Sequence, residues 1–82
     1  MPKPLTDSGN KNLIAKTLII LRQQHGLSQR ELAKQLQLLG CDIDKNVITR
    51  IETQTRYVTD IEIQKICKLF KISFEELIEE DN

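Results

Sequence analysis

With 82 residues, the chain has room for one small domain, and a domain of this size buries only about 60% of the surface that its unfolded chain exposes. Few aromatic residues and no Trp leave Leu, Ile and Val to build the core, which favours packed helices over a sandwich of sheets. The formal net charge is zero. Because no stretch approaches the roughly 20 apolar residues of a membrane span, we expect a cytoplasmic protein that does not contact a membrane.

Residues 1–11 are predicted to form a flexible N-terminal arm, followed by a folded domain over residues 12–79. Apolar residues recur at helical spacing through that domain, and strict alternation over strand length is absent. The first helix is predicted over residues 12–24, and Gly26 ends it. Its inner stripe is Ile14, Leu18 and Leu21.

The second helix begins at Ser28, because Ser28 and Glu31 form a capping box in which each side chain satisfies a backbone N–H. Residues 40–43 then form a connection, and Asp44 caps a third helix that runs to about Thr53. The predicted inner face of the second helix is Leu32, Ala33, Leu36 and Leu39.

Two more capping boxes open the last two helices, Thr59 with Glu62 and Ser73 with Glu76. Residues 80–82 are predicted to form an acidic tail after the fifth helix. The fourth helix is predicted to bury Ile63, Ile66, Cys67 and Phe70. The fifth helix is predicted to turn inward Phe74, Leu77 and Ile78.

The third helix separates an apolar side from a polar side. Its apolar residues are Val47, Ile48 and Ile51. Its exposed side presents Lys45, Asn46, Thr49 and Thr53, with Arg50 at the flank. These side chains suit DNA, because Arg pairs with guanine, Asn pairs with adenine, and a Thr methyl group contacts the methyl group of thymine. An amphipathic helix with a merely solvated polar face shows the same pattern, so the pattern needs its context.

The zero net charge conceals an uneven distribution. Residues 1–58 contain nine Lys or Arg against five Asp or Glu, whereas residues 59–82 contain three against seven. The basic part can therefore face phosphate while the acidic end points away. A charged, solvated helix end explains the acidic residues equally well.

The chain contains GLSQRELA at residues 26–33, ITRIE at residues 48–52 and ISFEEL at residues 72–77. In this order and spacing they resemble the phage repressor and Cro-like helix-turn-helix family, also called the Xre family. The resemblance covers about residues 14–78. It implies an all-α, five-helix lambda-repressor-like DNA-binding domain, with the third helix (about residues 44–53) in the major groove.

The chain departs from the family at two places. The segment between Leu36 and Ile48 is longer than usual, which implies a longer second helix or an enlarged connection between helices two and three. Gln54 stands where the family usually has Gly, and a left-handed turn there costs more with Gln.

The resemblance also implies roles for individual residues. Base contacts are implied for Lys45, Asn46, Thr49 and Arg50. Contacts with the DNA backbone are implied for Arg22, Gln29, Thr53, Arg56 and Tyr57. Gln29 also matches a residue that braces the recognition helix, and Tyr57 equally suits a partly buried structural position. Arg22 and Glu52 match a salt bridge between helices one and three, which we interpret as structural first.

The sequence predicts no catalytic residue, no metal site and no cofactor, so we do not expect an enzyme. The single histidine, His25, lies at a helix end, where a surface or capping role is commonest. Cys41 and Cys67 have no partners at metal-ligand spacing and are expected to stay reduced.

The first helix carries three apolar residues partly outside its inner stripe, namely Leu13, Ile19 and Ile20. They indicate a fuller core, a homodimer whose two recognition helices reach half-sites about 34 Å apart, or a toxin or other protein partner. The expected function is sequence-specific binding of double-stranded DNA by a transcriptional regulator that acts as a repressor. The alternative is an antitoxin or protein-interaction module whose main role is binding a protein partner.

Overall fold

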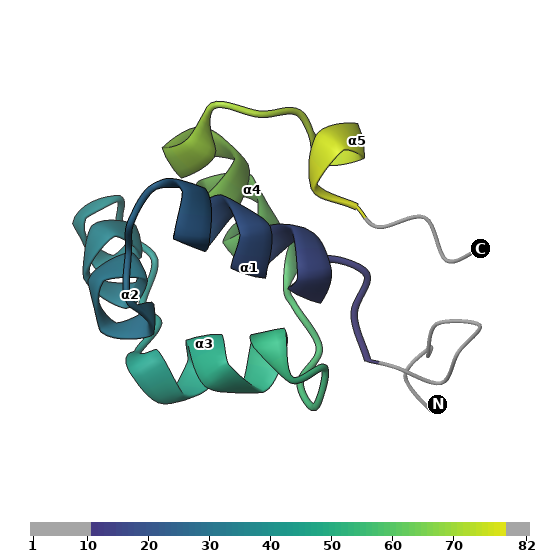
Figure 1. The fold of residues 1–82 in the computed structure, drawn as a ribbon, viewed down its shortest axis with the longest axis horizontal. Coiled ribbons are helices and arrows are strands. Elements are labelled where there is room, and N and C mark those ends of the chain that lie inside the picture. The colour runs from purple at the N-terminus through teal and green to yellow at the C-terminus, as the bar shows by residue number, and fades with distance from the viewer. Residues whose placement is uncertain (1–10, 79–82) are drawn as a thin grey trace.

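The computed structural model describes residues 11–78. Within them the chain forms helices and no strand, so the predicted all-α fold class is confirmed. The helices, in the order shown in Figure 1, are α1 (Ala15–Gln24), α2 (Gln29–Leu38), α3 (Lys45–Glu52), α4 (Asp60–Phe70) and α5 (Phe74–Leu77). The acidic tail predicted over residues 80–82, and the arm predicted over residues 1–11 apart from its last residue, lie outside the described residues.

Local capping interactions set where the helices begin. The boxes predicted at Ser28, Thr59 and Ser73 are all present, and in each the cap side chain and the Glu three residues later satisfy one another's backbone N–H groups. At the start of α3, the Oδ1 atom of Asp44 accepts a hydrogen bond from the Val47 N–H at 2.9 Å. Each such cap contributes about 1 kcal/mol, so the start of α3 is well determined.

Left-handed residues end four of the helices within residues 11–78. After α1 and α2 they are glycines, Gly26 with φ of 66° and Gly40 with φ of 86°. After α3 and α4 they are Gln54 with φ of 61° and Lys71 with φ of 57°. The left-handed turn considered for residue 54 is therefore present. It is formed by Gln54, although glycine adopts this conformation at a lower cost in free energy.

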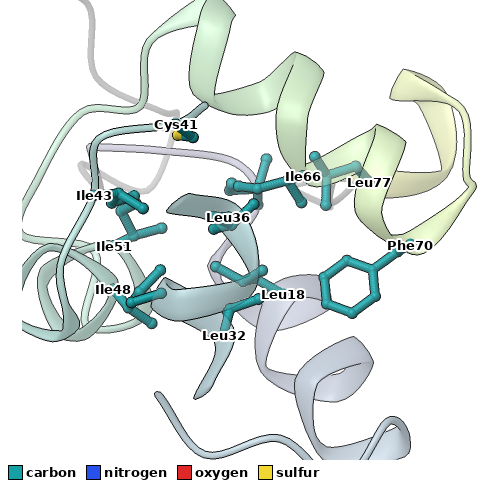
Figure 2. Packing of buried hydrophobic residues seen from close by; sticks show 12 residues of the cluster. Leu18, Leu32, Leu36, Cys41, Ile43, Ile48, Ile51, Ile66, Phe70 and Leu77 are labelled. Carbon is teal, nitrogen blue, oxygen red and sulfur yellow. The ribbon is translucent and has the colours of Figure 1, made fainter. Parts of the chain in front are cut away.

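The helices meet around one hydrophobic core (Figure 2). Figure 2 shows Leu18 of α1 and Leu32 and Leu36 of α2 at its centre, and all three side chains are fully buried. The other helices contribute Ile48, Ile51, Ile66, Phe70 and Leu77. Full burial of one such side chain stabilises the fold by about 1.5–3 kcal/mol, so packing of α3 into this core holds the helix at the surface.

The connection between α2 and α3 takes part in the core. Residues 39–44 join the two helices, and within them Cys41 and Ile43 are buried. The side-chain amide of Gln37 donates a hydrogen bond of 2.8 Å to the carbonyl oxygen of Ile43. The enlarged connection predicted between these helices is thus a packed segment that supports the start of α3.

Asn12 ties the start of α1 to the end of α3. Its Oδ1 atom accepts hydrogen bonds from the N–H groups of Ile14 and Ala15, at 3.2 and 3.0 Å. Its Nδ2 atom donates to the carbonyl oxygens of Ile51 and Arg56, both at 3.0 Å. Because this side chain is buried and fully bonded, it fixes the geometry of the segment that follows α3.

Several predictions made from the pattern are wrong. Ile63 and Cys67, which the fourth helix was predicted to bury, are only partly buried. α1 begins at Ala15 rather than at residue 12, because Asn12 acts as a capping residue instead of a helical one. α2 ends at Leu38, so Leu39 follows the helix and is only partly buried. Phe74 is 50% exposed, because α5 is a single turn and Leu77 takes its inward position.

Candidate nucleic-acid interface

The outer side of α3 carries polar side chains that are not used by the fold. Lys45, Asn46 and Arg50 are exposed, and none of the three side chains makes a hydrogen bond or ion pair with another residue between 11 and 78. The opposite side of the same helix buries Ile48 and Ile51. The helix therefore presents an amide, an ammonium and a guanidinium group to whatever lies against it.

Thr49 differs from its neighbours on α3, because its hydroxyl is already engaged. Its Oγ1 atom lies 2.8 Å from Oε1 of Gln29 and 3.1 Å from the carbonyl oxygen of Lys45. The side chain is half-buried between α2 and the outer side of α3. Thr49 thus links the exposed surface of α3 to a polar network beneath it.

That network joins three helices. Arg22 of α1 donates from Nε and Nη2 to the carboxylate of Glu52, at 2.7 and 3.1 Å, and from Nη1 to the carbonyl oxygen of Leu27. Gln29 of α2 donates from Nε2 to the same carboxylate at 2.8 Å. The side chain of Glu52 is only 4% exposed, so the pair is shielded from water. Truncating one partner of such a pair is strongly destabilising, since it leaves a buried charge uncompensated.

The salt bridge expected between Arg22 and Glu52 is therefore confirmed, and so is the bracing of the recognition helix by Gln29. The Arg22 side chain is only 16% exposed and uses each of its nitrogens within the fold. Both residues were also expected to contact the DNA backbone, and that part of the expectation remains a proposal.

The loop after α3 is shaped by hydrogen bonds to the last helical carbonyls. The Gln54 N–H donates to the carbonyl oxygen of Ile51, and the Thr55 N–H donates to that of Arg50, both at 3.0 Å. The Thr53 hydroxyl donates to the carbonyl oxygen of Thr49 at 2.9 Å. Thr53 and Thr55 are exposed, and their hydroxyl groups lie 3.1 Å apart just after the end of α3.

Arg56, expected to contact phosphate, is held by a carboxylate. Its Nη1 and Nη2 atoms donate to the two oxygens of Glu62 at 2.8 and 3.0 Å. Burial raises the pKa of the Glu62 carboxyl, but the hydrogen bonds from Arg56 and Thr59 outweigh it and hold that pKa below its ordinary value. The first role of Arg56 is thus to fasten the loop to α4.

Tyr57 lies half-buried in the same loop, and Lys11 stands over its ring with 5.6 Å from Nζ to the ring centroid. Lys11 was not among the residues singled out from the sequence. Its only signal there is its positive charge, which nothing in the local pattern distinguishes from that of other lysines. The fold brings this ammonium group beside the loop that follows α3.

The acidic residues that the structure describes near its C-terminal end lie away from α3. Figure 1 shows α5 and the end of α4 on the far side of α1 from α3. Glu75 and Glu76, both on α5, are exposed there. The other acidic residues of this run, residues 79–81, lie outside the described part of the chain. Repulsion of phosphate by the two described carboxylates is thereby kept from the outer side of α3.

Other expected features lie outside this interface. Cys41 and Cys67 are free thiols, and burial raises the pKa of both. His25 follows α1, where its Nδ1 donates to the carbonyl oxygen of Leu21 and its ring packs edge-on against Phe70. Between residues 11 and 78 no group of acidic, His or Cys side chains is arranged to hold a metal ion. In the same range no helix is long and apolar enough to cross a membrane.

A capped helix, a packed connection and a second helix whose outer side presents uncommitted polar groups define a helix-turn-helix domain of the DNA-binding class. The family model described as helix-turn-helix matches residues 18–77, which is most of the chain. The protein belongs to this Xre-like family of DNA-binding transcription regulators, whose members are generally non-enzymatic. None of the curated proteins compared with the chain matches it.

Proposed function

We propose that this protein is a sequence-specific transcriptional repressor that inserts α3 into the major groove of double-stranded DNA and has no catalytic activity. One observation carries the proposal: Lys45, Asn46 and Arg50 are exposed and unbonded within residues 11–78, on a helix whose other side is fixed in the core. Because packing already fixes the backbone of α3, only the exposed side chains lose conformational entropy on binding, which favours recognition of a fixed pattern of base edges.

Base readout and backbone contact are divided among different residues in this proposal. Arg50 is the residue type that pairs with guanine, Asn46 is the type that pairs with adenine, and Lys45 pairs with an acceptor on a base or with phosphate. Contacts with phosphate come from Tyr57, Thr53 and the remaining N–H of the Gln29 amide, with Lys11 beside them. Arg22 and Arg56 contribute mainly by holding the helix and the loop, because both are committed to carboxylates.

Repression follows from occupancy. A domain bound to its operator blocks access of the transcription machinery to the overlapping sequence, and no ligand or reaction is required for that effect. Cationic side chains supply affinity that falls with added salt, whereas the outer side of α3 supplies the choice of sequence.

The test is selection of bound DNA from a random duplex pool with the purified protein at two salt concentrations. Enrichment of one motif at both concentrations is the expected result, and inverted half-sites about 10 bp apart would indicate a dimer on DNA. Binding that enriches no sequence and simply fades with salt would contradict the proposal.

A second candidate function, binding of a protein partner, is favoured by apolar side chains left exposed on α1 and just before it. Leu13, two residues before α1, is 38% exposed, and Ile20 of α1 is 46% exposed. Ile19, predicted with them to lie partly outside the inner stripe, is half-buried. A homodimer covers them in the DNA-bound state that we favour, and a toxin covers them if the protein acts as an antitoxin. Light scattering of wild type and Ile20→Ser, each measured free and bound to the selected duplex, separates these cases, because only a homodimer loses mass when this side chain is replaced.

A further inference from the structure

We infer that Thr49 recognises a thymine through its methyl group, and that the network beneath α3 favours this contact by occupying the hydrogen of the Thr49 hydroxyl. The inference rests on the proposed function, since it requires α3 to lie in the major groove. It adds a specific base preference, and a cause for it, at a position where the residue type alone allows several bases.

The orientation of the Gln29 amide is the first step. The carboxylate of Glu52 faces this amide at 2.8 Å, and it is an acceptor only. Gln29 must therefore point its nitrogen towards Glu52, and its oxygen must point the other way, towards Thr49. Rotating the amide by half a turn would set an oxygen against the carboxylate and would cost the hydrogen bond to Glu52. Arg22 holds the carboxylate from its other side and fixes the arrangement.

The state of the Thr49 hydroxyl is the second step. Its two near neighbours are the Gln29 Oε1 atom and the Lys45 carbonyl oxygen, at 2.8 and 3.1 Å, and both are acceptors. A hydroxyl has a single hydrogen to donate, and that hydrogen lies between these two oxygens. Thr49 cannot then donate to N7 or O6 of guanine, to N7 of adenine or to O4 of thymine.

The Oγ1 atom of Thr49 keeps lone pairs, which could accept only from N6 of adenine or N4 of cytosine. Against a thymine, the group that remains is the methyl. Thr49 is half-buried and lies among the exposed side chains of Lys45, Asn46 and Arg50, so it reaches only a base that the helix approaches closely. In the major groove the one apolar group that a base presents is the C5-methyl of thymine. Contact between two methyl groups releases water from both without requiring a donor, which matches what Thr49 has left.

The test uses the duplex selected with wild-type protein and replaces each thymine singly by deoxyuridine, which removes only the C5-methyl. One replacement is expected to weaken wild-type binding about fourfold, because burial of one such group is worth about 0.8 kcal/mol and 1.4 kcal/mol is tenfold in affinity. Thr49→Val keeps the methyl and loses the hydroxyl, so it should retain this sensitivity. Thr49→Ser keeps the hydroxyl and loses the methyl, so it should bind both duplexes equally.

Three results would overturn the inference: no thymine in the site is sensitive in the wild type, Thr49→Ser keeps the sensitivity, or Thr49→Val loses it while still melting cooperatively. The wild-type measurement needs no variant, so poor folding of a variant does not leave the inference untested. Failure of the proposed function looks different, because then no sequence is selected and no duplex exists on which to make the replacement.

Discussion

Replacing Gln54 by Gly should stabilise this protein, although it removes a side chain. Gln54 follows α3 with φ of 61°, and its N–H and that of Thr55 close the last turn through hydrogen bonds of 3.0 Å. A residue with a Cβ pays about 1–2 kcal/mol in this left-handed region, and glycine does not. The unfolded glycine chain is more flexible, which returns about 0.4–1 kcal/mol of the gain.

The net expectation for Gln54→Gly is a free energy of unfolding higher by about 0.5–1 kcal/mol, from the difference of these two terms. In a domain of this size that corresponds to a melting temperature higher by about 2–8 °C. Thermal melting by circular dichroism measures it, with Gln54→Ala as the matched control that keeps the Cβ. If Gln54→Gly melts no higher than wild type, or if Gln54→Ala gains as much, the reasoning from backbone strain is refuted.

Two further predictions concern buried polar groups. Asn12→Ala should lower the free energy of unfolding by about 2–4 kcal/mol. It removes the acceptor of two N–H groups at the start of α1, and it leaves the carbonyl oxygens of Ile51 and Arg56 without their donor. Urea denaturation measures this loss. The partners of Glu62 lower the pKa of its carboxyl group in the folded state. The stability that this ion pair contributes is therefore complete above about pH 4.5, the ordinary pKa of the carboxyl, and is lost as the pH falls through the lower pKa of the folded state. Glu62→Gln should therefore show a shallower loss of stability than wild type as the pH is lowered from 5.

Each of these predictions has a matched control. Asn12→Ser keeps an uncharged oxygen that can accept from the start of α1 and loses the amide group that donates to both carbonyl oxygens, so its loss of stability should lie between those of wild type and Asn12→Ala. An equal loss in both variants would show that the capping oxygen contributes nothing. Glu75→Gln removes an exposed carboxylate that accepts no hydrogen bond from residues 11–78, and it should follow the wild-type curve in acid. A slope for Glu62→Gln as steep as that of wild type would refute the role of its ion pair.

The sequence predicted the helix starts well because the signals are local. A cap and its Glu partner lie three residues apart, so Ser28 with Glu31 or Thr59 with Glu62 is visible without a fold. The buried side of α3 followed from its spacing in the same way. The pair of Arg22 and Glu52, thirty residues apart, came only from the resemblance to a family.

Long-range polar contacts escaped prediction, because nothing local marks them. Asn12 reads as an ordinary helical residue, although it bonds to a carbonyl 39 residues away. Arg56 reads as a free cation in a loop, and only the fold shows that Glu62 holds it. Phe74 has the right spacing to be buried, but α5 is a single turn that buries one residue, and that residue is Leu77. Such errors concern tertiary partners rather than the type of element.

The interface shows the same difference between local features, which the sequence predicts, and contacts between helices, which it does not. That α3 has a polar outer side was visible from the sequence, whereas the unequal roles of its side chains were not. Thr49 and Arg50 are neighbours of similar promise in the sequence, yet one is bonded to Gln29 and the other is unbonded within the described residues. Which donors remain for DNA depends on contacts between helices, and those are fixed only by the packed structure.

The central claim, that α3 chooses the sequence, is tested most directly by measuring affinities for the selected site and for every single-base variant of it with wild type and Arg50→Ala. We predict that Arg50→Ala loses about 1–3 kcal/mol of discrimination at one base pair and keeps the wild-type preferences elsewhere. Lys68→Ala, which removes an equal charge from the end of α4 on the far side of α1, should leave all preferences unchanged. An equal loss of affinity on every sequence with Arg50→Ala would contradict the claim.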